Sequence, residues 1–248
     1  MIKVVRVTSV GLLLGSFLNV CIYRIPRGES IVFPPSHCPQ CQHRLGPLEL
    51  IPLLSFLWQR GRCRHCSAPI SWRYPLVELL AAVLLSIVYL RFGWSPELVY
   101  YSGLTALLLV ISFIDLDTMV IPTQLVGVGV VWASAYNIYT RQPLLDWLLA
   151  GALGYGLFYL IYILSRGGMG GGDVRLAGLL GLVLGLKQLA CALLIAFVAG
   201  AIVSLLLLAS GRANRKTAIP FGPFLAIGCY VAAMWGQSIL NWYSGLFF

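Results

Sequence analysis

Residues 97–114, ELVYYSGLTALLLVISFI, decide the class of fold. Glu97, at the first position, is the one charged side chain in this stretch. A helix of about 18 residues rises ~27 Å, close to the hydrocarbon thickness of a bilayer. The apolar residues are continuous and do not alternate with polar ones, which argues against a strand of a membrane barrel. We therefore predict a membrane-spanning helix here.

Comparable apolar stretches recur along the 248 residues, of which 59% are hydrophobic and 10% charged. The mean hydropathy of +0.88 is too high for the surface of a soluble domain. Breaks at proline or polar residues separate eight predicted spans, at about 5–23, 75–91, 97–114, 121–139, 144–164, 174–187, 189–209 and 219–240. The sequence thus predicts an all-α polytopic membrane protein. The first span lacks a following small-residue cleavage site, so we expect it to be retained as a helix.

The basic residues predict how the chain crosses the membrane. If segment 24–73 lies on side one and the spans alternate, side one receives twelve Lys and Arg, including Arg166, Arg215 and Lys216. The other side receives five, which are Lys3, Arg6, Arg91, Arg141 and Lys187. The positive-inside rule makes side one cytoplasmic and puts both termini outside. The net charge of +9 therefore reflects topology and attraction to lipid headgroups.

One sizeable polar segment, 24–74, separates the first two spans. It divides the chain into a first membrane helix (1–23), a cytoplasmic domain (24–74) and a membrane core (75–248). This small domain is joined to membrane helices at both ends. Such a domain is better suited to hold the loop in a folded form, or to form part of a substrate-binding surface, than to bind nucleic acid. We therefore predict lipid contacts and no nucleic-acid partner.

Two C-x-x-C pairs lie in this polar segment, with 21 residues between them. Two pairs of thiolates at such spacing can close a tetrahedron around Zn²⁺. Disulfides are disfavoured because the predicted cytoplasmic location is reducing; free thiols remain an alternative. We predict a structural, ribbon-like Zn site formed by Cys38, Cys41, Cys63 and Cys66. The nearby His37, His43 and His65 are expected to support the site or to be solvated, because four thiolates complete the shell.

Carboxylates are scarce, with eight Asp and Glu in the chain, so those at membrane level are informative. Asp115 and Asp117 end the predicted third span, and Asp173 opens the sixth after Gly170, Gly171 and Gly172. Two carboxylates within hydrogen-bond reach share one proton and can activate a water for peptide hydrolysis. The exposed backbone of the Gly run could accept an extended peptide as an added strand.

Other interpretations of these residues stay open at this point. Asp173 could be the N-cap of its helix, and Asp115 and Asp117 could be solvated interface residues. Glu78 could pair with an Arg at the cytoplasmic rim or contact substrate. The same carboxylates could serve a transporter, although such sites usually lie near the midplane rather than at helix ends. A non-enzymatic assembly scaffold is a further alternative.

Six motifs, in order, resemble those of the bacterial type IV prepilin leader peptidases, the G-x-G-D intramembrane aspartyl proteases. They are Gly15-Ser16-Phe17-Leu18-Asn19-Val20, the two C-x-x-C pairs, Ser71-Trp72-Arg73-Tyr74-Pro75, Ile114-Asp115-Leu116-Asp117, Gly170-Gly171-Gly172-Asp173 and Ile219-Pro220-Phe221-Gly222-Pro223. The resemblance extends over about residues 11–230. Two positions depart from the family pattern: Arg175 stands where Lys is usual, and Thr123 where Asn or Asp is frequent.

The resemblance implies an endopeptidase of the bacterial inner membrane that cuts at the cytoplasmic face. It implies Asp115 and Asp173 as the catalytic pair. It leaves Asp117, Glu78, Arg175 and the glycines 170–172 as supporting or substrate-binding residues. The implied substrates are prepilins or type II secretion pseudopilins, with a basic leader and a Gly before the cut. Members of the family often also methylate the new amino terminus with S-adenosylmethionine.

Overall fold

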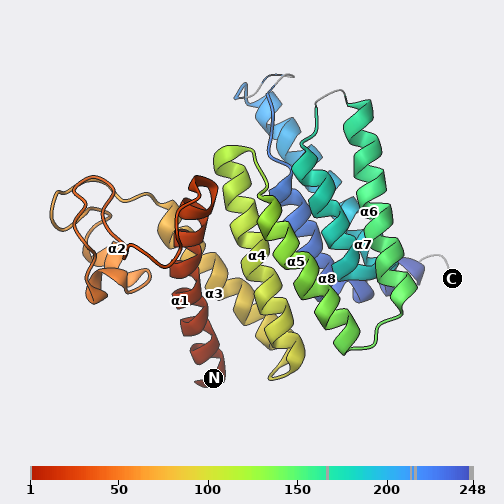
Figure 1. The fold of residues 1–248 in the computed structure, drawn as a ribbon, viewed down its shortest axis with the longest axis horizontal. Helices are drawn as coiled ribbons and strands as arrows, with labels where there is room; N and C mark the ends of the chain where they lie inside the picture. The colour runs from red at the N-terminus through yellow and green to blue at the C-terminus, as the bar shows by residue number, and fades with distance from the viewer. Residues whose placement is uncertain (1, 166–167, 213, 215–216, 246–248) are drawn as a thin grey trace. The chain divides into compact units, whose positions relative to one another are not determined.

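The computed structural model describes residues 2–165, 168–212, 214 and 217–245. Within these residues it contains helices and no strand, as Figure 1 shows. The chain divides into two compact units, Met1–Val110 and Ile111–Phe248. Arg166, Arg215 and Lys216, which the topology prediction counts, lie outside the described residues, as do the end residues 1 and 246–248.

Six of the described helices are long and apolar enough to cross a membrane, and they confirm a multi-pass membrane protein. These are α1 (Ile2–Arg24), α3 (Arg73–Phe92), α4 (Pro96–Thr118), α6 (Leu144–Leu164), α7 (Gly171–Ala209) and α8 (Gly222–Ser244). Helix α5 (Thr123–Tyr139) has 17 residues. Shorter helices η1 (Ile25–Arg27), η2 (Pro47–Leu50) and α2 (Leu54–Trp58) lie in the polar segment.

Helix α6 shows how the apolar composition is used. Its buried stripe consists mostly of small residues, including Ala150, Gly151 and Gly154. Its large aliphatic side chains point outward, with Leu145 72% and Leu153 59% exposed. Exposed leucines on this scale would be unfavourable in water and are stable in lipid. The small buried residues allow neighbouring backbones to approach closely.

In the first unit, α1 and α3 form a close antiparallel pair. The hydroxyl oxygens of Thr8 and Ser86 lie 2.8 Å apart near one end of the pair. The Asn19 side-chain amide donates to the Tyr74 carbonyl at 3.1 Å near the other end. Between them, a Cβ atom added at Gly15 would lie 2.6 Å from the backbone of α3 at Glu78. The first signature motif therefore contributes small and hydrogen-bonding residues to a helix–helix contact.

Helix α7 reverses direction at Gly185, where φ is 70° and ψ is 177°. A Cβ atom added at Gly154 of α6 would contact both the Ala177 carbonyl and, at 3.5 Å, the Leu189 side chain. A straight helix would separate residues 177 and 189 by about 18 Å, so the two segments must run back along each other. Figure 1 shows both ends of α7 on the same side of the second unit. The predicted sixth and seventh spans are therefore the two arms of α7, 171–184 and 186–209.

The reversal is fixed from α6. The Asp146 carboxylate accepts a hydrogen bond from the Leu186 N–H at 3.5 Å. A Cβ atom added at Gly185 would overlap this carboxylate. The backbone conformation of Gly185 is also one that side chains other than glycine rarely adopt. Both constraints require glycine at this turn.

Candidate active site and candidate metal centre

Asp115 lies in the last turn of α4, at its buried face. The helix ends where Met119, with φ of 56°, donates its N–H to the Asp115 carbonyl at 2.8 Å. The Asp115 side chain is 4% exposed, and its Oδ2 accepts the Gly222 N–H at 2.9 Å. A Cβ atom added at Gly222 would lie 2.6 Å from this oxygen. The late proline–glycine motif therefore provides a donor that holds the carboxylate in place at the start of α8.

Asp173 is the third residue of α7, and the N-cap of this helix is Gly170. The interpretation of Asp173 as an N-cap is therefore wrong. Its position in the first helical turn is electrostatically favourable for a carboxylate. The side chain is 9% exposed, and its Oδ1 is buried without a hydrogen-bond partner among the described residues.

Asp115 and Asp173 line the same cavity, of about 240 Å³, in the second unit. The remaining lining residues come from the α4–α5 connection and the start of α7. They are Met119, Val120, Ile121, Gly170, Gly171, Gly172 and Arg175. Asp117, which the sequence groups with Asp115, is exposed and does not line this cavity.

The three glycines differ in their surroundings. Gly170 is extended and exposed, so its backbone is accessible beside the cavity. Gly171 and Gly172 are already helical residues of α7. The extended backbone that could accept a peptide is therefore shorter than the glycine run predicts. A Cβ atom added at Gly172 would lie 2.8 Å from Ile121, whereas one at Gly171 would meet open space. Gly172 is thus a packing residue, and Gly170 and Gly171 leave room at the cavity.

The two departures from the family pattern contact each other. The Arg175 guanidinium donates to the Thr123 hydroxyl and, at 3.2 Å, to the Gly171 carbonyl. This contact joins the start of α5 to the first turn of α7 at the rim of the cavity. Sequence reasoning noted both residues separately and missed their pairing. Both positions depart from the family pattern in the same chain, and this could have indicated that the two side chains contact each other.

Glu78 has a different partner from the arginine that the sequence suggests. Its side chain is 8% exposed, and its Oε2 accepts the Leu53 N–H at 2.8 Å. Leu53 precedes the short helix α2 and has φ of 59°. This hydrogen bond joins Leu53, whose backbone is strained, to Glu78 of α3, and so attaches the polar segment to that helix within the first unit.

The two C-x-x-C pairs form matched turns. The Cys38 N–H donates to the His43 carbonyl and the Gln42 N–H to the Cys38 carbonyl, both at 2.9 Å. The same pattern recurs at the second pair, where the Cys63 N–H bonds to Ala68 and the Ser67 N–H to Cys63. Backbone N–H groups of Cys66 and His65 lower the pKa of the Cys63 thiol to about 7, whereas the pKa of the adjacent Cys66 thiol is raised to about 12.

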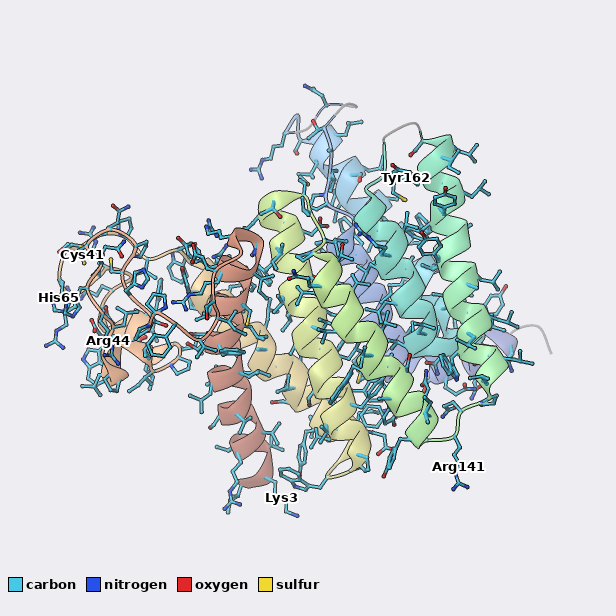
Figure 2. All side chains as sticks on the ribbon, in the orientation of Figure 1. Lys3, Cys41, Arg44, His65, Arg141 and Tyr162 are labelled. Atoms are coloured by element: carbon cyan, nitrogen blue, oxygen red, sulfur yellow. The ribbon has the colours of Figure 1, made fainter. Side chains whose placement is uncertain are left out.

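The four cysteine sulfur atoms lie within 4.8 Å of one another. Cys38 and Cys66 are separated by 3.8 Å between their sulfurs, and Cys41 and Cys63 by 4.0 Å. A tetrahedral ion with metal–sulfur bonds of about 2.3 Å requires sulfurs ~3.8 Å apart. The cluster can therefore bind a metal ion with little rearrangement. Figure 2 shows Cys41 and His65 on neighbouring loops of this segment.

Comparison with known families identifies the class. Residues 9–92 match the bacterial peptidase A24 N-terminal domain, and residues 102–205 match the type IV leader peptidase family. The chain belongs to this family of membrane-embedded peptidases.

Individual relatives agree over nearly the whole chain. A protein of Bacillus subtilis named prepilin leader peptidase/N-methyltransferase is 37% identical over 94% of both chains. Proteins of the same name are 37% identical in Aeromonas salmonicida, over 94% of this chain and 90% of the relative, and 42% identical in Myxococcus xanthus, over 84% of this chain and 64% of the relative. No solved structure is significantly similar. These matches favour a peptidase over a transporter or a scaffold.

The Arg175–Thr123 contact predicts coupled effects on stability. Replacing Arg175 by Ala or Thr123 by Val is expected to lower the free energy of unfolding by about 1 kcal/mol. Because the two changes remove the same hydrogen bond, the double variant is expected to lose less than the sum of the single losses. Thermal unfolding in detergent measures the losses of the single and double variants. Lys187→Ala, which removes an exposed positive charge elsewhere on α7, is the control. Strictly additive losses would contradict the pairing.

Proposed function

We propose that this chain is a prepilin leader peptidase and N-methyltransferase in which Asp115 and Asp173 form the catalytic pair. The observation that carries the proposal is their convergence, from the end of α4 and the start of α7, on one cavity. The family membership supports peptide hydrolysis as the chemistry. The names of the relatives support prepilins as substrates.

The mechanism follows from the different surroundings of the two carboxylates. Oδ2 of Asp115 is fixed by the Gly222 N–H, whereas Oδ1 of Asp173 is buried without a hydrogen-bond partner among the residues described. A buried oxygen of this kind suits a shared proton or a bound water. One carboxylate removes a proton from the attacking water while the other protonates the scissile carbonyl. The roles then exchange to expel the amine.

A shared proton predicts a bell-shaped dependence of the cleavage rate on pH. The pair is active with one proton and inactive with none or two, so the rate falls at both extremes. Initial rates of wild-type cleavage, measured in detergent across a pH series, test this. A rate that stays constant between about pH 4 and pH 9 would count against the shared proton.

For the membrane orientation we propose that segment 24–73 and the catalytic pair face the cytoplasm of a bacterial inner membrane, with both termini outside. The excess of Lys and Arg on that side supports this orientation. A substrate with a basic leader would keep the leader at the cytoplasmic surface and its apolar helix in lipid. The bond after the Gly would then lie at the depth of the cavity.

Methylation of the new amino terminus rests on the resemblance and on the names of the relatives. The cavity at Asp115 does not fit a methyl donor of nucleoside size, because about 240 Å³ is below the usual range for such pockets and none of its lining residues is aromatic. We therefore assign S-adenosylmethionine no residue in this cavity.

Zn²⁺ is the ion that we propose for the cysteine cluster, since four thiolates in a tetrahedron favour it. It would fix the loops of the polar segment, which we propose as a separate domain covering 24–74. Cys38→Ser with Cys41→Ser is expected to abolish the thiolate charge-transfer band of the Co²⁺-substituted protein and to expose this segment to proteases. Cys191→Ser, which alters a cysteine outside the cluster, is the matched control. A wild type without this band would contradict a thiolate metal site.

The function itself is tested with purified protein in detergent and a prepilin-like substrate that carries a basic leader and a Gly at the junction. Mass spectrometry is expected to show a cut after the Gly and, with S-adenosylmethionine added, the mass of one methyl group on the product. A cut without the added methyl group would restrict the proposal to the peptidase. A folded wild type that cuts none of several such substrates would overturn it.

A further inference from the structure

We propose that His43, Glu49 and His65 form a second metal site, for a divalent ion such as Zn²⁺, beside the cysteine cluster. The three residues come from three parts of the polar segment. His43 follows the first C-x-x-C pair, Glu49 lies in η2, and His65 lies inside the second pair. One ligand atom from each lies within 4.8 Å of the other two. Sequence reasoning treated the histidines as supporting or solvated and did not connect them with Glu49.

The backbone of all three residues is held by hydrogen bonds or by neighbouring cysteines. The His43 carbonyl accepts the Cys38 N–H in the first turn, and His65 lies between Cys63 and Cys66. Glu49 uses its Oε2 to accept the Gly46 N–H at 2.8 Å. The ligand atoms lie within 4.8 Å of one another, and an ion with Zn–N and Zn–O bonds of about 2.0–2.1 Å would bring them to a spacing of roughly 3.3 Å.

The second oxygen of Glu49 provides the observation that points to a ligand. The side chain is 9% exposed, and Oε1 is buried without a hydrogen-bond partner among the described residues. This oxygen faces the imidazole Nε2 of His65 at 4.0 Å. A buried carboxylate oxygen without a partner is costly, and a bound cation between it and the imidazole removes that cost.

The two histidine side chains lie directly beside each other. The two imidazole rings stack with their centroids 3.4 Å apart and an interplanar angle of 30°. Each imidazole carries ring nitrogens that can donate a lone pair to a metal ion, so the stack brings two nitrogen donors to the carboxylate of Glu49. Two imidazoles and one carboxylate suit Zn²⁺ and its neighbours in the first transition row.

The site differs from the cysteine cluster in ligands and access. The four thiolates complete one coordination shell by themselves, so neither histidine is needed there. His65 is 43% exposed and His43 is also exposed, which leaves a coordination position open to water. An ion held by three protein ligands with one open position exchanges more readily than an ion in a closed shell.

The test counts and distinguishes the ions in the full-length protein. Protein stripped by a chelator and reloaded with Zn²⁺ is desalted and analysed for metal, and a parallel sample is titrated with Co²⁺. The wild type is expected to bind two ions, one of which shows thiolate charge transfer while the other does not. Glu49→Gln, which keeps the side-chain volume, and His43→Ala are each expected to bind only the thiolate-bound ion.

His37→Ala is the matched control. His37 is the one remaining histidine of the polar segment, and it is not part of the group formed by His43, Glu49 and His65. It is expected to keep both ions. A wild type that binds only the thiolate-bound ion, or a second ion that persists in Glu49→Gln, would overturn the proposal. The charge-transfer band reports the cysteine cluster independently, so failure of that site and failure of this one give different spectra.

Discussion

Cleavage of a prepilin-like substrate is expected to fall by about a thousandfold when either Asp115 or Asp173 is replaced by Asn. Asn keeps the size of the side chain but cannot share a proton between two carboxylates. An amide oxygen at position 115 can still accept the Gly222 N–H, so the hydrogen bond that joins the end of α4 to the start of α8 is retained. Because the two carboxylates act as a unit, the double variant is expected to be no slower than either single one.

Asp117→Asn is the matched control for this experiment, since Asp117 lies two residues from Asp115 and does not line the cavity. It is expected to cut at close to the wild-type rate. Cleavage products are quantified by mass spectrometry, with thermal unfolding as the check on folding. Loss of activity at Asp117 and not at Asp115 would reassign the pair. Activity that survives at Asp115 and Asp173 would move the catalytic centre elsewhere.

The largest expected effect on stability is at the turn of α7. Gly185→Ala is expected to destabilise the protein by about 2–4 kcal/mol, because it combines a strained backbone with an overlapping side chain. The added Cβ atom would overlap the exposed Asp146 carboxylate, so this side chain would have to move away and would lose its bond to Leu186. Thermal unfolding in detergent and the yield of folded protein measure the effect.

Gly127→Ala provides the comparison, because Gly127 lies within α5 and a Cβ atom there meets nothing within 4 Å. Alanine has a higher helix propensity than glycine, so this variant is expected to be as stable as the wild type or slightly more stable. A Gly185→Ala protein that melts with the wild type would show that the reversal tolerates a side chain.

Most of the fold follows from the apolar composition. Helices must satisfy their own backbone hydrogen bonds in lipid, so long apolar stretches become helices and polar breaks become their ends. The sequence therefore placed the eight segments in the right order and separated the two arms of α7. The turn itself was expected at Leu186 to Gln188 and lies at Gly185. A lone glycine among leucines carries no polar signal, and the Asp146 carboxylate that fixes it is 39 residues earlier in the chain.

The site was predicted less completely than the fold. Scarcity singled out Asp115, Asp117 and Asp173, and the resemblance to the family chose Asp115 and Asp173 among them. Cysteine spacing predicted the four thiolates, because these signals are local. The partners of these residues are not local. The Gly222 donor to Asp115, the Leu53 donor to Glu78 and the contact of Arg175 with Thr123 join segments that only tertiary packing brings together.

The reversal at Gly185 also bears on how the chain enters the membrane. The arm 171–184 is only about 21 Å long, shorter than a hydrocarbon core of ~30 Å. By itself it is a poor membrane-spanning helix, and no polar loop follows that could be delivered separately to the far side. We therefore expect the two arms to insert together, as one hairpin, after the second arm has been synthesised. On this expectation Asp173 joins Asp115 only after residues 186–209 have been made.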